Sequence, residues 1–357
     1  QHRIAVGYTG CGLATPAQYG EGWYNEGATA DIATQMTIFS GETLFIFDHW
    51  MGTTGIDSTD TSISLTVLSP ESLTAIYSTG VKVTMIKNPR QNWGGFIVDG
   101  DTLAPADSLT FYWTNGSYHT IAPTQPDYSG DTMRYTFTGW SDSPDTMRTI
   151  GPLVDDIELI ANYQLEYVYR VFKEPAADTF GYTYIGSNYF YGAESESCEV
   201  WFIPGTEIYT QISSYDFAPG ATVTFEFIEW DDGWLDTVRT EILTHPIERT
   251  AHYIGTAYVR LAKYPAEPYG WLRIADSTYY GAIADGWIQY GTPTEIEASP
   301  VDLIPGVDSA YVFDHWSDGG APIHDITIHS SETFIAYYER MWIDLSLCIE
   351  PDTVNFD

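Results

Sequence analysis

Basic residues are scarce in this chain of 357 residues, where 14 Lys and Arg stand against 49 Asp and Glu for a formal net charge of −35. Nucleic-acid binding depends on clustered Lys and Arg that displace counterions, so this balance argues against a nucleic-acid partner. It also disfavours direct docking on anionic lipid. Acidic surfaces repel one another and stay dissolved. We therefore expect an exported, acidic surface protein, with adaptation to high salt as the alternative interpretation.

Long apolar runs are missing as well. No run approaches the ~20 residues of a membrane-spanning helix, so we expect no membrane insertion. The chain begins at Gln1 without an initiator Met, which fits an exported mature chain whose signal peptide has been removed. A trimmed fragment would look the same. The expected location is extracellular or at the cell surface.

Cysteine is limited to Cys11, Cys198 and Cys348, and their spacing matches no metal motif. An odd number of cysteines in an exported protein leaves at least one thiol free or bonded between chains. Cys11 lies near one end of the chain and Cys348 near the other. An intermolecular disulfide through these two residues could therefore lock one chain to the next.

Catalytic signatures are absent from the sequence: no nucleophile elbow, phosphate loop or paired-cysteine zinc pattern occurs. Asp48-His49 and Asp314-His315 place an acid beside a histidine in only two of four repeated positions. We therefore expect no enzyme and no cofactor. The acidic turns Asp231-Asp232 and Asp318 carry a calcium-type ligand, but turn aspartates usually bond their own backbone, so calcium is the weaker interpretation.

A short aromatic phrase recurs four times, as aromatic-x-Phe-x-x-Trp. The copies are Phe45–Trp50, Tyr135–Trp140, Phe225–Trp230 and Tyr311–Trp316. Their tryptophans, Trp50, Trp140, Trp230 and Trp316, follow one another at intervals of 90, 90 and 86 residues. A fixed period indicates one structural unit repeated along the chain. Because these tryptophans recur once per unit, we interpret them as core positions.

The repeats predict four small β modules followed by a tail. The expected boundaries are 1–79, 80–164, 165–254, 255–338 and, for the tail, 339–357. Alternating runs rich in Tyr, Val, Ile and Thr, separated by Gly and Asp turns, predict antiparallel β-sandwich modules in an elongated all-β chain. Phe313 and Trp316 have opposite parity along a strand, so we expect a β-bulge or a strand end between them that brings both side chains inward.

Lysine recurs at one place in three of the modules. Lys87-Asn88-Pro89, Lys173-Glu174-Pro175 and Lys263-Tyr264-Pro265 each follow an alternating strand, which the proline is expected to close. The functional interpretation is a recurring cation contact. The simpler interpretation, which we favour from the sequence, is a lysine stem that covers neighbouring side chains.

The closing half of each unit resembles the divergent B-repeat modules of bacterial surface proteins, named after internalin B. The residues that carry the likeness are Tyr311–Gly320 with Phe334–Tyr337, and Gly22–Tyr24, Gly27–Thr29 and Trp50–Gly52. Four copies cover residues 1–338. The resemblance implies a small Ig-like or β-grasp-like fold that serves as spacer, adhesion stalk or assembly unit, and it transfers no catalytic residues.

The tail is the expected assembly element. Ile343, Leu345, Leu347 and Ile349 share one face of an alternating strand. It could fold back on the fourth unit, begin a further domain, or add to a sheet edge of the next subunit. Head-to-tail strand donation that does not close produces an open filament.

The sequence thus favours a non-enzymatic subunit of an extracellular fibre or surface layer that polymerises with itself. The alternative is an adhesin or glycan-binding stalk for extracellular polysaccharide. Tyr189, Tyr191, Tyr279 and Tyr280 do not follow the repeat and are the candidate contact residues. Asn115-Gly116-Ser117 is a glycosylation sequon whose use the sequence does not decide.

Overall fold

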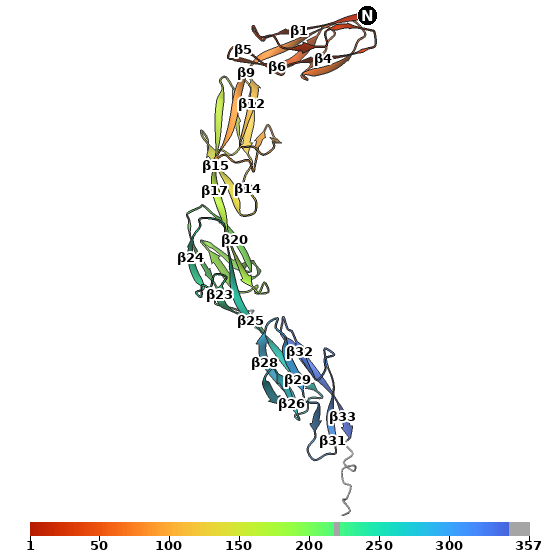
Figure 1. Cartoon of the computed structure of the whole chain (residues 1–357), viewed down its shortest axis with the longest axis vertical. Coiled ribbons are helices and arrows are strands. Elements are labelled where there is room, and N and C mark those ends of the chain that lie inside the picture. The colour runs from red at the N-terminus through yellow and green to blue at the C-terminus, as the bar shows by residue number, and fades with distance from the viewer. Residues whose placement is uncertain (218–221, 343–357) are drawn as a thin grey trace, which may run out of the picture. The chain divides into compact units, whose positions relative to one another are not determined.

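A computed structural model describes residues 1–217 and 222–342 of the chain. Its described elements are strands, apart from one 3-10 helix at Gly192–Ser195, so the all-β prediction is confirmed. The chain divides into two compact units, Gln1–Glu166 and Tyr167–Asp357. Each unit contains two separate hydrophobic cores, and each core defines one module. The strands can be followed in Figure 1.

The first module has two sheets around one core. Its strands are β1 (His2–Thr9), β2 (Gln18–Tyr19), β3 (Gly22–Tyr24), β4 (Thr29–Thr34), β5 (Thr37–Ser40), β6 (Thr43–Gly52), β7 (Asp57–Ser58), β8 (Ser62–Thr66) and the first half of β9 (Glu71–Asn88). One sheet pairs β3-β1-β9-β6-β5, and the other pairs β2-β4-β8.

The second module repeats this plan. It uses the second half of β9, β10 (Phe96–Val98), β11 (Asp101–Thr102), β12 (Ser108–Thr114), β13 (His119–Pro123), β14 (Asp127–Ser129), β15 (Met133–Trp140), β16 (Arg148–Ile150) and the first half of β17 (Ile157–Glu174). β12, β9 and β17 lie side by side in one sheet, and β11-β10-β13-β16 form the other.

The third module begins with the second half of β17. Its other strands are β18 (Tyr182–Ile185), β19 (Asn188–Tyr191), β20 (Ser197–Phe202), β21 (Glu207–Ile212), β22 (Tyr215–Phe217), β23 (Val223–Trp230), β24 (Val238–Ile242) and the first half of β25 (Ile247–Tyr264). One sheet pairs β20-β17-β25-β23-β22, and the other pairs β19-β18-β21-β24.

The fourth module begins with the second half of β25. It continues with β26 (Trp271–Ile274), β27 (Ser277–Tyr280), β28 (Ile283–Gln289), β29 (Thr294–Ala298), β30 (Val301–Leu303), β31 (Ser309–Trp316), β32 (Ile323–Ile326) and β33 (Glu332–Trp342). One sheet pairs β28-β25-β33-β31-β30, and the other pairs β27-β26-β29-β32.

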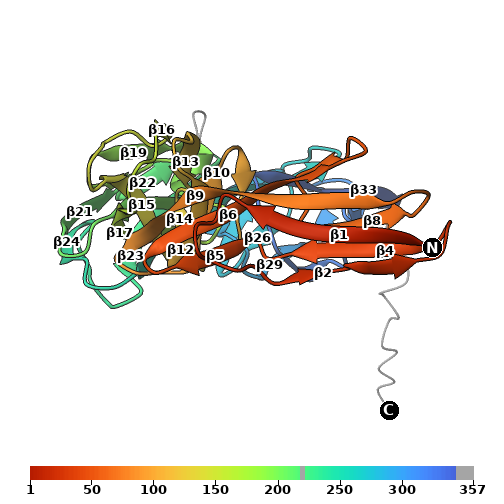
Figure 2. The same ribbon diagram turned by 90° about the horizontal axis from the view of Figure 1, so that it is seen from above.

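The first and last strands of every module pair in parallel, which the prediction of antiparallel sheets had missed. β1 pairs with β9 over six residue pairs, and Figure 2 shows the two strands running side by side. The same six-pair parallel register joins β9 to β17, β17 to β25 and β25 to β33. We call these the terminal-strand pairs. Each module therefore has one mixed sheet and one antiparallel sheet.

The predicted module boundaries fall inside continuous strands. The divisions at 79/80, 164/165 and 254/255 lie within β9, β17 and β25, each of which is 18 residues long. The closing strand of one module runs on as the opening strand of the next. These strands end at Asn88, Glu174 and Tyr264, one residue before a proline that cannot donate to the ladder, as expected.

The four tryptophans of the repeated phrase are buried, with exposed fractions of 0–4 %. Phe47, Phe227 and Phe313 pack against the tryptophan three residues later, with ring centroids 5.6–6.1 Å apart. The predicted bulge is present between Phe47 and His49, Phe227 and Glu229, and Phe313 and His315. Two residues of the phrase strand oppose one on its partner there, which turns both aromatics inward.

Candidate functional site

Three modules contain a buried lysine that pairs with a buried aspartate. Lys87 Nζ lies 2.6 Å from Asp127 Oδ2, Lys173 Nζ lies 2.5 Å from Asp216 Oδ2, and Lys263 Nζ lies 2.5 Å from Asp302 Oδ2. All six side chains are at most 1 % exposed. We call these the Lys–Asp sites. They correct the interpretation of the lysines as stems that cover neighbours, because the amines are buried too.

The repeat places both partners of each Lys–Asp site. Each lysine lies at the end of an opening strand, directly before the residue that precedes proline. Each aspartate lies on a short strand opposite the first aromatic of the repeated phrase, with Asp216 facing Phe225 and Asp302 facing Tyr311. The site thus joins the end of the opening strand to the short strand that borders the phrase.

Polar and aromatic groups complete the coordination of each ammonium. Lys173 Nζ donates to the carbonyl of Phe180 at 2.6 Å, and Lys263 Nζ donates to the carbonyl of Tyr269 at 2.7 Å. A tyrosine ring from the closing strand lies 5.2–5.4 Å from each Nζ, a distance that favours cation–π attraction. These rings belong to Tyr163, Tyr253 and Tyr338.

A glycine makes room for each carboxylate. A Cβ added at Gly94, Gly181 or Gly270 would lie 1.6–1.8 Å from Oδ1 of the site aspartate. No side chain can occupy that space while the carboxylate remains in place. The Lys–Asp site therefore has four recurring parts: lysine, aspartate, glycine and tyrosine.

The electrostatics of the sites follow from burial. Burial lowers the pKa of Lys87 and of Lys263, and the paired carboxylates oppose that shift. Burial also raises the pKa of Tyr163, Tyr253 and Tyr338, so these phenols stay neutral. Transferring two charges from water costs several kcal/mol per ion before their attraction is counted, so a buried pair contributes little net stability but is costly to break.

The first module has no such pair at the matching positions. Tyr8 occupies the lysine position, because it faces Ala75 as Lys87 faces Ala161. Ile38 occupies the aspartate position, because it faces Phe45 as Asp127 faces Tyr135. Ile38 is buried in the core of that module. An apolar residue can therefore fill the aspartate position, so the module plan does not require the ion pair.

The structure gives no support to an intermolecular disulfide through Cys11. Cys11 is 2 % exposed and belongs to the first core, and Cys198 is buried in the third. Both are free thiols. Burial raises the pKa of Cys11, and it raises the pKa of Cys198 to about 11. The predicted intermolecular bond requires Cys11 at the protein surface, and Cys11 is buried. Cys348 lies outside the described residues.

Thiol labelling tests the burial of Cys11 and Cys198. In a Cys348→Ser variant we expect no reaction with a thiol reagent at neutral pH while the chain is folded. Both the lack of access and the raised pKa suppress the reactive thiolate. After denaturation two thiols should react per chain. Rapid labelling of the folded variant would contradict the buried positions.

The remaining predicted sites have mixed outcomes. Ile343, Leu345, Leu347 and Ile349 lie outside the described residues. The carboxylate of Asp232 pairs with Arg239 at 2.6 Å, and that of Asp318 pairs with His324 at 2.9 Å, so both acidic turns are engaged within the protein. Within residues 1–217 and 222–342, no group of three or more His, Cys, Asp or Glu is placed to hold a metal ion.

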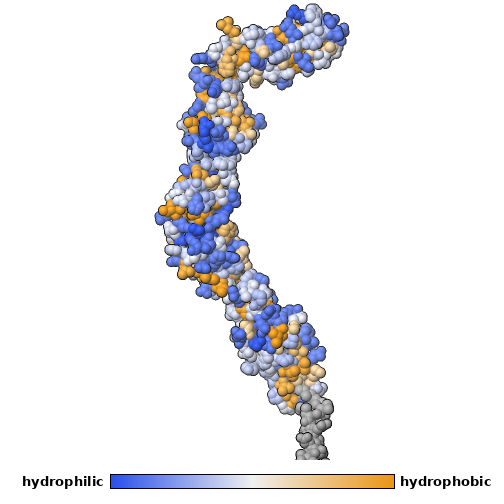
Figure 3. Space-filling view, in the orientation of Figure 1, coloured by the Kyte–Doolittle hydropathy of each residue, from blue (hydrophilic) through white to orange (hydrophobic). Residues whose placement is uncertain are grey.

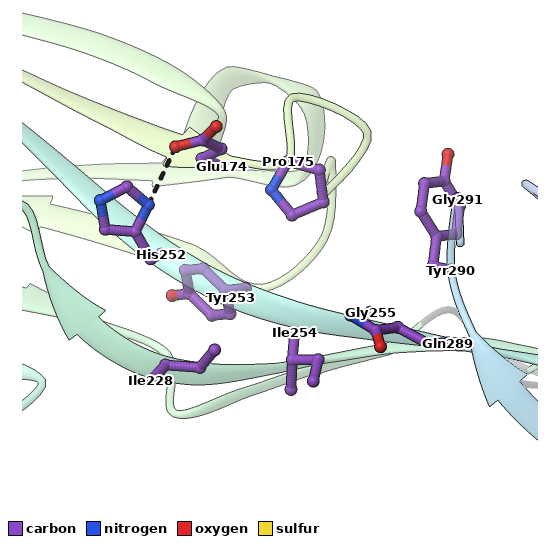
Figure 4. A pocket seen from close by; sticks show the side chains of 10 residues that line it. All are labelled: Glu174, Pro175, Ile228, His252, Tyr253, Ile254, Gly255, Gln289, Tyr290 and Gly291. Carbon is purple, nitrogen blue, oxygen red and sulfur yellow. Dashed lines mark ion pairs between the residues drawn. The ribbon is translucent and has the colours of Figure 1, made fainter. Parts of the chain in front are cut away.

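An open hollow of about 480 Å³ lies beside β25 in the second unit. Figure 4 shows its lining, where His252 Nδ1 pairs with Glu174 Oε2 at 2.9 Å. Tyr253, on the same wall, donates its hydroxyl to the carbonyl of Ser213 at 2.7 Å. The lining contributes no cysteine or serine nucleophile, and we assign it no catalytic role.

Exposed tyrosines gather on the antiparallel sheet of the third module. Tyr189 is 57 % and Tyr191 62 % exposed, and their rings stack with centroids 5.7 Å apart. Tyr184 lies 4.5 Å from Tyr189 and 5.8 Å from Tyr209. We call these four residues the tyrosine platform. In the fourth module Tyr280 is exposed, whereas Tyr279 packs against the core.

Hydrophobic residues on the visible face form small separate patches in Figure 3. In the described part of the chain, no helix has the length and apolar character needed to cross a membrane.

No family model matches the chain, and no curated protein sequence matches it either.

Solved structures provide the remaining comparisons. The Bacillus anthracis TIE protein has a TM-score of 0.21 at 10 % identity, covering 87 % of this chain and 60 % of that one, so the chain spans less than two thirds of its length. BcpA, the major pilin subunit of Bacillus cereus, has a TM-score of 0.19 at 10 % identity, covering 73 % and 100 %. Streptococcal SHIRT domains 3–4 from a cell surface protein have a TM-score of 0.15 at 12 % identity, covering 46 % and 98 %. Likenesses at these TM-scores carry no argument about function.

Proposed function

We propose that this chain is a non-enzymatic extracellular structural protein that bears tension along its modules, as the subunit of a fibre or surface layer. The observation that carries the proposal is the terminal-strand pair. Each of the four modules enters and leaves through two adjacent parallel strands in a six-pair register. The two modules of the first unit join through the uninterrupted strand β9, and the two modules of the second unit join through the uninterrupted strand β25.

Parallel terminal strands give a module a specific response to stretching. Tension pulls the start of the opening strand and the end of the closing strand in opposite directions along one axis. All the hydrogen bonds of the pair are then loaded together, since the bonds of a parallel ladder are evenly spaced along it. An antiparallel hairpin pulled at its open end would instead lose its bonds one after another.

Surface chemistry supports an extracellular role. The net charge of −35 keeps separate chains apart in dilute solution, and salt or divalent cations would reduce that repulsion. We also propose that the modules are distant relatives of the divergent B-repeat modules. The recurrence of the phrase and of its buried tryptophans is the support for that relationship.

Assembly is tested by electron microscopy of the full chain at low salt, at high salt and with added calcium. We expect filaments or sheets in the screened conditions, built from subunits joined through their ends. Removing residues 343–357 should leave folded monomers if the tail joins subunits. Unchanged filaments after that truncation contradict a role for the tail, and discrete monomers of the full chain in every condition contradict the fibre.

Glycan binding is the second candidate, because the tyrosine platform presents stacked, exposed aromatic rings. Such rings can pack against the apolar faces of sugars. Polysaccharide pull-down should then depend on Tyr189 and Tyr191, whose replacement by alanine leaves the core untouched. The matched control is Tyr280→Ala, an exposed tyrosine outside the platform. Equal retention on polysaccharide of the unchanged protein, the variant with alanine at Tyr189 and Tyr191, and the Tyr280→Ala control rules out glycan binding by the platform.

A further inference from the structure

The Lys–Asp site of the third module differs from the other two because it contains a second buried acid. Asp178 is 0 % exposed, and its Oδ2 lies 3.8 Å from Lys173 Nζ. In the described part of the chain, Lys87 and Lys263 each pair with a single carboxylate. Lys173 therefore faces two carboxyl groups in an interior that holds one compensating positive charge.

The two carboxyl groups of this site leave oxygen atoms unused. Asp216 Oδ1 and Asp178 Oδ2 are buried and have no hydrogen-bond partner. In the other modules the matching oxygen is occupied, since Thr124 donates to Asp127 Oδ1 at 2.7 Å and Ser299 donates to Asp302 Oδ1. In the third module Ser213 donates instead to the carbonyl of Tyr182 at 3.3 Å.

Two buried carboxyl groups beside one ammonium favour a shared proton. Burial, reinforced by the Asp216 carboxylate, raises the pKa of Asp178 to about 7. A large share of Asp178 therefore remains protonated at neutral pH and can donate to Asp216, as in other acid pairs that share a site. In the second module the side chain near the aspartate is Gln91, which donates to Asp127 Oδ2 at 2.7 Å but cannot supply a proton.

We propose that Lys173 and Asp216 condense into an amide bond, and that Asp178 is the acid that promotes this reaction. The reacting amine and carboxyl are already in contact, at 2.5 Å, and both are fully buried. Holding two reactants in contact replaces a bimolecular encounter with a unimolecular step. The product exchanges a buried ion pair, which is expensive to desolvate, for a neutral amide.

The reaction balances without any external reagent. A proton passes from the Lys173 ammonium to the Asp216 carboxylate, which leaves a neutral amine and a neutral acid. The Nζ lone pair attacks Cγ of Asp216, and the carbonyl electrons move to Oδ1, which Asp178 stabilises by donating its proton. Oδ2 then leaves as water with a proton from nitrogen, the C=O bond re-forms, and Asp178 recovers its proton. Nothing is oxidised or reduced.

The bond would tie the opening strand β17 covalently to β22. This inference does not depend on the proposed function, because the bond can be detected in a chain that never assembles. It predicts one crosslink in the folded protein, at the third module, and none at Lys87 or Lys263.

Mass spectrometry of the purified full chain tests the proposal. Trypsin should fail to cut after Lys173, and the peptide 171–239 should be lighter than its sequence mass by one water molecule. A second digestion with chymotrypsin should yield a branched peptide that joins Lys173 to Asp216. Trypsin should cut normally after Lys87 and Lys263, which serve as internal controls.

Other outcomes are decisive against the proposal. Normal cleavage after Lys173 excludes the amide. A peptide that is lighter by one water molecule does not rescue the proposal in that case, because water can also be lost at the Asp232-Gly233 sequence. Branched peptides at Lys87 or Lys263 overturn the role of Asp178. The variants Asp178→Ala and Asp178→Asn should restore cleavage after Lys173, whereas retained crosslinking in either contradicts a promoting acid. Circular dichroism checks that the variants fold, and the result for the unchanged protein stands without them.

Discussion

Replacing Asp127 with alanine is expected to destabilise the second module by roughly 3–5 kcal/mol, because it leaves the ammonium of Lys87 buried without its charge partner. Both side chains are at most 1 % exposed, so water cannot replace the lost carboxylate in the folded state. Gln91 loses its acceptor at the same time. Hydrogen exchange of the β12–β16 peptides measures the effect locally, which a whole-chain melt of several modules would not.

The double variant Lys87→Met, Asp127→Leu provides the matched control. Replacing a buried ion pair with apolar side chains of similar size is often neutral or stabilising. The first module, where buried Ile38 fills the aspartate position, shows that the architecture accepts this change. We expect the double variant to recover most of the stability. A loss below about 1 kcal/mol in the single variant, typical of exposed pairs, contradicts the buried site.

The pH dependence of the single variant provides a second check. Burial lowers the pKa of Lys87, and Asp127 opposes that shift in the intact site. Without Asp127 the folded state binds the lysine proton less tightly than the unfolded state does. The unfolded chain then carries more protons, so the free energy of unfolding of the variant rises with pH toward the usual lysine pKa of about 10.4. A penalty that grows with pH contradicts this account.

Replacing Trp316 with alanine is expected to destabilise the fourth module by about 3–5 kcal/mol, as for other large-to-small changes in a core. Trp316 is 0 % exposed and packs against Phe313 at a centroid distance of 6.1 Å. Its indole N–H also donates to the carbonyl of Pro322 at 3.3 Å. The change therefore removes apolar burial, an aromatic contact and a hydrogen bond together.

Trp287→Ala is the control in the same module, because Trp287 is 51 % exposed. We expect a change much smaller than that of Trp316→Ala. Hydrogen exchange of the peptides from β26 to β33 avoids the loss of tryptophan fluorescence that both variants share. Equal effects of the two substitutions would contradict the distinction between phrase tryptophans and surface tryptophans.

The repeated aromatic phrase was the sequence feature that predicted most of the fold. Its fixed spacing indicated like modules, and the opposite parity of Phe313 and Trp316 predicted the bulge that the structure has. The continuity of the long strands could also be predicted in part from the sequence. In β9 the buried positions alternate from Leu73 to Lys87 with a single exposed interruption at Thr79, and no proline separates the two halves. Only the predicted boundary divided them.

Parallel pairing and the Lys–Asp sites were beyond the sequence, because both depend on contacts between distant residues. The lysine and aspartate of a site are about 40 residues apart, and the number differs from module to module. The available signal was compositional, since three of only four lysines precede a proline by two positions. That signal located the amine but not its partner or its burial. Asp178 has no counterpart in the other modules and thus no repeat to reveal it.

The most direct test of tension bearing is to stretch single molecules in two geometries. Pulling the chain from its two ends loads the terminal-strand pairs in shear, whereas pulling through handles on the exposed residues Asp101 of β11 and Asp145 applies force to the second module at positions outside those strands. We predict that end-to-end pulling requires clearly higher forces to unfold that module. Equal forces in the two geometries, or weaker resistance from end to end, would contradict a structural role under tension.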